Sequence, residues 1–274
     1  MNPLLAITLE EFREALRNRW FAGAMLLFLA LAMSLAFIGS APVGEVRASP
    51  LSVTVVSLAS LSVYLVPLIA LLISFDAVVG EQDRGTLLLL LTYPVSRWQI
   101  LLGKYLGALC VLGLAILVGY GAAGVVLAIA ADATEGWRSY AAMMGSSWLL
   151  GAVFVGLGCL VSVLVRQRPT AVGLAVGIWL VMVVVYDLAL LGLLLADKDL
   201  ALSPTLFAML MTLNPTDAYR IVNLAGSEAS GLVAGMSGSG RMAGVSVPVL
   251  LGGLIVWAVV PFAAAVAVWR QREL

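Results

Sequence analysis

Long apolar stretches alternate with short charged segments along this chain. Five of the stretches carry no charged residue, and a sixth, residues 169–196, carries only Asp187. The five are residues 20–44, 48–75, 105–131, 139–165 and 242–269. Each is longer than the roughly 20 residues that a helix needs to cross a bilayer core, and lipid excludes open strands because their backbone groups would stay unpaired. We therefore expect an all-α polytopic membrane protein, a single transmembrane domain over residues 1–274, with six transmembrane helices at about residues 20–40, 51–75, 98–131, 140–165, 170–196 and 247–269.

The residues before the first span follow a different pattern. Leu5, Leu9, Phe12 and Leu16 recur at helical spacing, and charged residues occupy the opposite face. This pattern predicts an amphipathic helix over about residues 3–18 that lies in the membrane interface. The alternative is a solvated extension of the first span.

An even number of spans places both termini on one side of the membrane. If that side is the inside, its segments hold ten of the 15 Lys and Arg residues, and the outside holds the other five. Positive residues are enriched on the cytoplasmic side of membrane proteins. The sequence therefore predicts a multi-pass protein of the bacterial inner membrane with both termini in the cytoplasm.

Composition supports a membrane protein and narrows its chemistry. Charged residues make up 11% of the chain, against about 25% in soluble domains. The net charge is zero, so nucleic acid is not an expected partner. The 274 residues contain no histidine, which excludes a histidine-ligated metal site and a Ser-His-Asp triad within them. Cys110 and Cys159 form no CxxC motif and are expected to be small packed residues.

The loop between the second and third spans, residues 76–97, contains an apolar run that is too short to cross a membrane. The run covers residues 85–93 and stops at Pro94, after which Ser96 and Gln99 form a capping box. A short helix rimmed by charged residues is typical of a docking element. The alternative is an interfacial turn that packs only on lipid. The flanking charged residues are Glu81, Asp83, Arg84 and Arg97.

The loop before the last span, residues 197–246, is expected to contain two short helices, near residues 205–212 and 216–224. Each follows a capping residue and a proline, the second at Asn214. Asp217 lies in the first turn, where a carboxylate is favoured. Tyr219 and Arg220 are residue types that suit a contact with a partner protein. The alternative for this group is local capping and packing.

Two further groups are weaker candidates for chemistry. Thioethers suit Cu(I), but the methionines of the outer loop are also simple packing residues, and we expect no metal site. Asp187 lies inside a span and Asp76 near the end of one, and carboxylates within membranes are functional candidates. A structural hydrogen bond or a proton relay would explain Asp187. The methionines are Met209, Met211, Met236 and Met242.

The loop 76–97 resembles the first cytoplasmic loop of ABC-2 type permeases, on the residues 80–81, 85–87, 91–97 and 103–105. The resemblance implies a non-catalytic membrane subunit that forms a homodimer with a second copy. It also implies separate cytoplasmic ABC ATPase subunits that bind ATP and Mg²⁺, because the chain lacks a phosphate-binding GxxxxGK[ST] loop. Gly103-x-x-x-Gly107 and Gly173-x-x-x-Gly177 are candidates for the dimer seam. The implied ATPase contacts are Glu81, Asp83, Arg84, Gly85, Thr86, Leu87, Pro94 and Arg97.

The outer-loop residues 213–220 and the chain length resemble one subgroup, the permease subunits that serve maturation of nitrous oxide reductase. This resemblance implies a periplasmic β-helical partner and a role in assembling a copper–sulfur cluster. Two alternatives stay open. One is an ABC-2 exporter of a lipid, a polysaccharide or a drug, and the other is a secondary carrier without an ATPase.

Overall fold

The computed structural model describes residues 3–39, 50–87, 92, 95–130, 136–196, 204–225 and 246–272. Over these residues every regular element is a helix, which confirms the all-α class. The elements are α1 Pro3–Arg17, α2 Arg19–Gly39, α3 Pro50–Ser74, α4 Val79–Asp83, α6 Arg97–Ala130, α7 Trp137–Leu164, α8 Arg168–Trp179, the π-helix η1 Leu180–Val185, α9 Tyr186–Ala196, α10 Pro204–Leu213, α11 Pro215–Ala225 and α13 Val247–Gln271.

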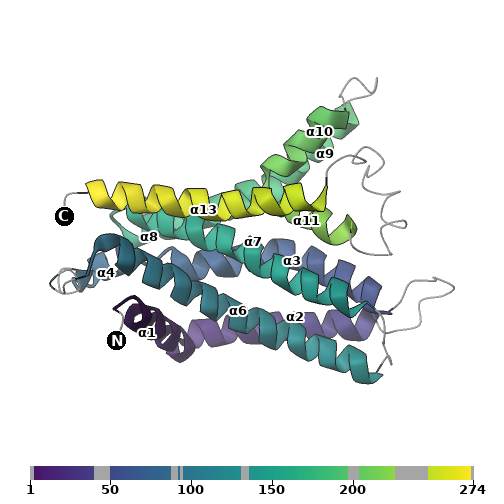
Figure 1. Ribbon diagram of the computed structural model, residues 1–274, viewed down its shortest axis with the longest axis horizontal. Helices are drawn as coiled ribbons and strands as arrows, with labels where there is room; N and C mark the ends of the chain where they lie inside the picture. Colours follow the sequence, from purple (N-terminus) through teal and green to yellow (C-terminus); the bar gives the residue numbers. More distant parts are fainter. Residues whose placement is uncertain are drawn as a thin grey trace.

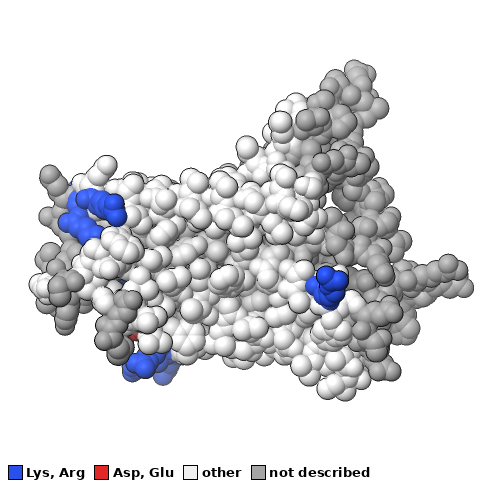
Figure 2. Space-filling model, in the orientation of Figure 1, with Lys and Arg blue, Asp and Glu red and all other residues white. Residues whose placement is uncertain are grey.

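Five helical stretches among the described residues are long and apolar enough to cross a membrane. A sixth arises if α1 and α2, which meet at a bend of 72°, are counted as one span. On the face in Figure 2, Lys and Arg lie towards the two ends of the molecule and the band between them carries no charge. The five stretches are Thr54–Asp83, Arg97–Ile129, Trp137–Leu164, Arg168–Leu193 and Val247–Gln271.

The long helices run along one axis, and the two ends of the bundle differ (Figure 1). Both termini and α4 lie at one end, which we call the α4 end. The helix α11 lies towards the other end, which we call the α11 end. A shared end for both termini is what an even number of spans requires.

The helix α7 is the centre of the bundle, with α3 and α13 packed against it. Of its most apolar 18 residues, 72% are buried within the chain. The fifth span, which consists of α8, η1 and α9, has only 17% of the corresponding residues buried. Its last part, α9, projects from the bundle together with α10 (Figure 1). Of the five long apolar stretches, the fifth span is therefore the one that its own chain buries least.

The first candidate dimer motif is used inside the protomer. A Cβ atom on Gly103 would lie 2.7 Å from Ile7 Cγ2, and one on Gly107 would lie 2.6 Å from Glu11 Cβ. The two glycines thus let α1 approach the backbone of α6 closely. Gly103 and Gly107 are therefore covered within the protomer, which argues against this candidate for the dimer seam.

Candidate functional site

The turn and short helix that follow α3 are fixed to the centre of the bundle. The backbone N–H groups of Val78 and Val79 donate to Ser162 Oγ on α7 at 2.8 and 3.0 Å. These groups begin α4, so a side chain from another helix satisfies donors that a helix start leaves unpaired. Gly85 then has φ +71°, a value that favours glycine, and the chain turns away from α4 there.

Among the described residues of this segment, some of the expected contact residues are exposed and others are not. Asp83, Arg84 and Gly85 are exposed, and Thr86 is half-buried. Leu87 is buried at 4% exposure and packs in the main core. Leu87 and Thr92 are helical, but Pro94 and the rest of the predicted short helix lie outside the described residues. Residues 82–85 form one continuous exposed stretch at the α4 end, which we call the loop surface.

Glu81 turns towards the bundle and meets a buried lysine. Lys104 on α6 is 7% exposed, and its Nζ donates to Glu81 Oε1 at 3.3 Å and to Glu11 Oε1 of α1. The Thr86 hydroxyl also donates to the Glu81 carboxylate. Glu81 therefore joins the loop to α1 and α6, and its side chain is only 15% exposed. It adds little to the surface that a partner could contact.

Asp76 joins the loop to the start of the fifth span. Its Oδ2 atom lies 2.8 Å from Arg168 Nη2 and 3.8 Å from Arg84 Nη2. Arg168 is the first residue of α8, and Arg84 also pairs with Glu14 of α1 at 3.4 Å. Asp76 thus lies between an arginine of the loop, Arg84, and an arginine of α8, Arg168.

Arg97 caps a helix end and is not turned to the loop surface. Its Nη1 donates to the carbonyl oxygens of Trp269 and Arg272 at 3.0 and 2.7 Å, where α13 ends. Arg272 in turn donates to Val163 and Val165 at the end of α7, at 2.5 and 3.1 Å. Cations are favoured at helix C-termini, where carbonyl groups lack partners. Arg97 is partly exposed, so its expected contact with an ATPase stays a prediction beside this capping role.

At the α11 end, the π-helix η1 of the fifth span, which we call the π-turn, meets the start of α11. The Asn214 Nδ2 and the Thr216 hydroxyl both donate to the carbonyl oxygen of Met182, at 2.7 and 3.2 Å. The same Asn214 accepts from the Thr216 N–H through Oδ1 at 3.1 Å, as an N-cap residue does. A π-turn widens the helix and disturbs its hydrogen-bond ladder. Asn214 and Thr216 supply donors at that point.

Arg220 holds the fifth span to α11 through a bidentate ion pair. Its Nη1 and Nη2 lie 2.9 and 3.2 Å from the Oδ1 and Oδ2 atoms of Asp187. Nη1 also lies 3.2 Å from Asp217 Oδ1. Bidentate Arg–carboxylate pairs are among the stronger and more directional polar contacts. Of the two explanations for Asp187, this geometry fits the structural one.

Asp217 is a buried carboxylate with an unusual titration. Burial raises its pKa from 3.8 to about 6, against the lowering effect of Arg220, and the nearby Asp187 charge raises it further. The Asp217 side chain is 1% exposed, and its Oδ2 atom has no hydrogen-bond partner among the described residues. Part of its charge is therefore uncompensated at neutral pH.

Tyr219 lies in the core. It is fully buried, and its hydroxyl is 2.8 Å from Ser147 Oγ on α7, which donates to Ser62 Oγ on α3 at 3.4 Å. Asn214 and Asp217 are also buried within the chain. The expectation that these three side chains contact a periplasmic protein is corrected, because α11 packs them against its own bundle. Arg220 is half-buried in its pair with Asp187.

Two of the four methionine candidates lie among the described residues, and these two do not face each other. Met209 and Met211 lie on α10 two residues apart, a spacing at which side chains do not face each other. Met236 and Met242 lie outside the described residues. Among the residues that the structure describes, no group of three or more His, Cys, Asp or Glu side chains is placed to hold a metal ion.

Sequence reasoning missed four residues that organise the α4 end, namely Lys104, Glu11, Ser162 and Arg168. Lys104 could have been found, because a lysine seven residues inside a predicted span is a functional candidate in itself. The partners Glu11 and Ser162 come from helices that are distant in sequence, and no local pattern indicates them.

The sequence of this helical bundle matches one known family almost from end to end. The model of the family described as ABC-2 family transporter protein matches residues 5–274, and the chain belongs to that family. It is therefore the membrane permease subunit of an ABC complex, which works with cytoplasmic ATPase subunits.

Two similar proteins indicate which group of ABC-2 permeases the chain resembles. A protein of Stutzerimonas stutzeri with the name "Probable ABC transporter permease protein NosY" is 42% identical over 276 residues, which cover 99% of each chain. A protein of Pseudomonas aeruginosa with the same name is 41% identical over 277 residues and the full length of both chains. The chain is thus similar to NosY permeases from end to end.

Proposed function

We propose that this permease passes ATP-driven movement from cytoplasmic ATPase subunits to a periplasmic partner, in the maturation of the copper–sulfur site of nitrous oxide reductase. The full-length similarity to proteins named NosY supports this specific role. The chain itself is non-catalytic, and ATP and Mg²⁺ bind to the ATPase subunits.

One observation carries the proposal of force transmission. Of the five long apolar stretches, the fifth span is the one least buried by its own chain, yet two ion pairs hold it, one at the first residue of α8 and one at the second residue of α9. Arg168 pairs with Asp76 at the α4 end, and Asp187 pairs with Arg220 at the α11 end. A helix that is loosely packed and tied at these two points can move as a rod, so that a shift of the loop reaches α11.

The orientation follows from the same proposal. The α4 end faces the cytoplasm of a bacterium, and the loop surface at residues 82–85 contacts the ATPase. The α11 end faces the periplasm and a β-helical partner. The complex contains two copies of this chain in the inner membrane. Cβ atoms on Gly173 and Gly177 would meet nothing within 4 Å, so these residues of α8 leave room for the second copy.

The outer ion pair gives the test. We expect Asp187→Asn to break the bidentate pair and to lower the copper content of nitrous oxide reductase in cells that depend on this permease. The double exchange Asp187→Arg with Arg220→Asp re-forms an opposite-charge pair and restores part of the copper loading. Leu191→Ala, at a lipid-exposed position of the same helix, is the matched control and leaves loading unchanged.

Two results would contradict the proposal. If a strain that lacks the permease makes a reductase with full copper content, the maturation role is wrong. If Asp187→Asn keeps full copper loading while the pair is shown to be broken, the maturation role stands and transmission through the fifth span is wrong.

A further inference from the structure

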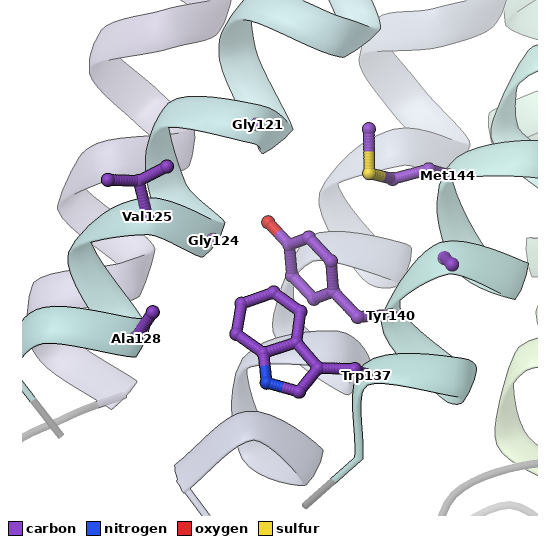
Figure 3. Close-up of a pocket in the computed structure, with 8 residues that line it drawn as sticks. Gly121, Gly124, Val125, Ala128, Trp137, Tyr140 and Met144 are labelled. Carbon is purple, nitrogen blue, oxygen red and sulfur yellow. The ribbon is translucent and has the colours of Figure 1, made fainter. Parts of the chain in front are cut away.

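A hollow lies between α6 and α7 at the α11 end, away from the ion pairs described above (Figure 3). Its volume is about 250 Å³. An apolar cavity of about 150 Å³ is large enough to bind benzene, so this hollow has room for part of a hydrocarbon chain. Both walls belong to helices that are long and apolar enough to cross a membrane.

The α6 wall is open because it carries glycines. A Cβ atom on Gly121 would meet nothing within 4 Å, so no side chain of the described residues fills the space in front of it. At Gly124 the Tyr140 ring approaches to 3.1 Å from a Cβ position. Val125 continues this wall one residue further on. The hollow is thus left by the absence of side chains on α6 and is floored by an aromatic ring of α7.

The α7 wall is preformed. Tyr140 is 3% exposed, and its hydroxyl donates to the carbonyl oxygen of Tyr120 at 2.5 Å. The Trp137 ring meets the Tyr140 ring edge-on, with centroids 5.8 Å apart. Met144 lies one turn further along the same face, and a thioether adapts well to irregular apolar partners. Trp and Tyr are typical of the level at which lipid headgroups begin.

A positive charge on α7 lies next to residues that line the hollow. Arg138 follows Trp137, is exposed, and lies three residues before Ala141, which lines the hollow on the same helix face. Within the described residues, no ion pair involves Arg138. An arginine near the membrane surface attracts anionic lipid headgroups, and guanidinium groups bind phosphate.

We propose that this hollow is a phospholipid site, in which Arg138 binds the headgroup phosphate and one acyl chain lies between α6 and α7. An apolar groove at hydrocarbon level below a cation at headgroup level matches the two parts of a phospholipid. The site is separate from the loop surface and from the Asp187–Arg220 pair, so lipid would support the outer ends of α6 and α7 without touching the transmission path.

The test is photo-cross-linking in nanodiscs that contain the permease with its ATPase subunits. The probe is a phosphatidylglycerol with a diazirine on one acyl chain, as a minor component in phosphatidylethanolamine. Mass spectrometry should locate the label on residues 121–128 and 137–144 above the level on other exposed helix faces. Gly121→Leu fills the hollow and should remove most of this excess, and Gly121→Ala should remove less.

Arg138→Ala should lower the labelling by roughly fivefold, the effect of one basic side chain near a membrane surface. Gly23→Leu on α2 is the matched control, because a Cβ atom there also meets nothing within 4 Å, and labelling of the hollow should not change.

Equal labelling of all exposed helix faces would overturn the site, because it would indicate bulk lipid only. So would unchanged labelling in Gly121→Leu, or wild-type labelling that appears only when a bound protein is removed from the α11 end. Arg138→Ala tests the same proposal without altering the core if Gly121→Leu fails to fold. Labelling is measured without nitrous oxide reductase, so failure of this site leaves the maturation proposal untouched.

Discussion

Asp217 shares one guanidinium with Asp187 and keeps a carboxylate oxygen without a described partner. Its folded pKa of about 6 lies above the value of 3.8 for the unfolded chain. Between these values the folded state holds a proton that the unfolded state has lost. The stabilisation from this proton is therefore complete below pH 3.8 and is lost as the pH rises through about 6.

We expect Asp217→Asn to flatten the pH dependence of stability between about pH 3.8 and 6. Across this range the wild type should lose on the order of 3 kcal/mol of its free energy of unfolding, because each unit of the Asp217 pKa shift is worth about 1.4 kcal/mol. The measurement is the thermal unfolding midpoint of wild type and variant in the same detergent at several pH values. Parallel curves for the two proteins would contradict the assignment to Asp217.

Lys104 is a second buried charged residue with a large expected effect on the free energy of unfolding. We expect Lys104→Met to destabilise the protein by roughly 3–5 kcal/mol, because Glu11 and Glu81 would then remain together without a cation. A triple variant that also carries Glu11→Gln and Glu81→Gln should recover much of the loss. Thermal unfolding tests both, with the exposed Arg13→Met on α1 as control. Equal stability of the single and triple variants would contradict the account.

At the scale of elements, the start of α11 and the π-turn form one unit through Asn214. We expect Asn214→Ala to speed hydrogen exchange both in residues 180–186 and in the first turn of α11. Asn214→Asp keeps the N-cap acceptor but removes the donor to Met182, so it should speed exchange at the π-turn and leave α11 protected. Hydrogen-exchange mass spectrometry separates the two cases. Equal effects of both variants at both places would argue against the shared role.

The sequence predicts the elements better than it predicts their contacts. Charge-free stretches locate the spans because the cost of a charge in lipid is local to the residue that carries it. The partners of Glu81 and Tyr219 come from helices far away in the chain, and the same residue types would serve equally well at a surface. Asn214-Pro215 predicts where α11 starts, but not that its polar side chains turn inward onto η1.

At the scale of the whole molecule, the described ion pairs gather at the two ends and the apolar bundle lies between them. At the α4 end, Glu81 and Asp76 tie the loop to α1, α6 and α8. At the α11 end, Arg220 ties α9 to α11. The fifth span is the element that has an ion pair in both groups. Its role as the connection between an ATPase and a periplasmic partner is the central claim of the proposed function.

The most direct test measures the movement of α9 relative to α7. Ala142→Cys and Leu188→Cys, both at exposed positions, carry spin labels in a chain with Cys110→Ser, and pulsed electron resonance gives the distance between them. We predict that this distance changes between the nucleotide-free and ATP-trapped complex. Arg168→Gln should abolish the change while ATP hydrolysis continues. Identical distances in both states, or an undiminished change in Arg168→Gln, would contradict transmission through the fifth span.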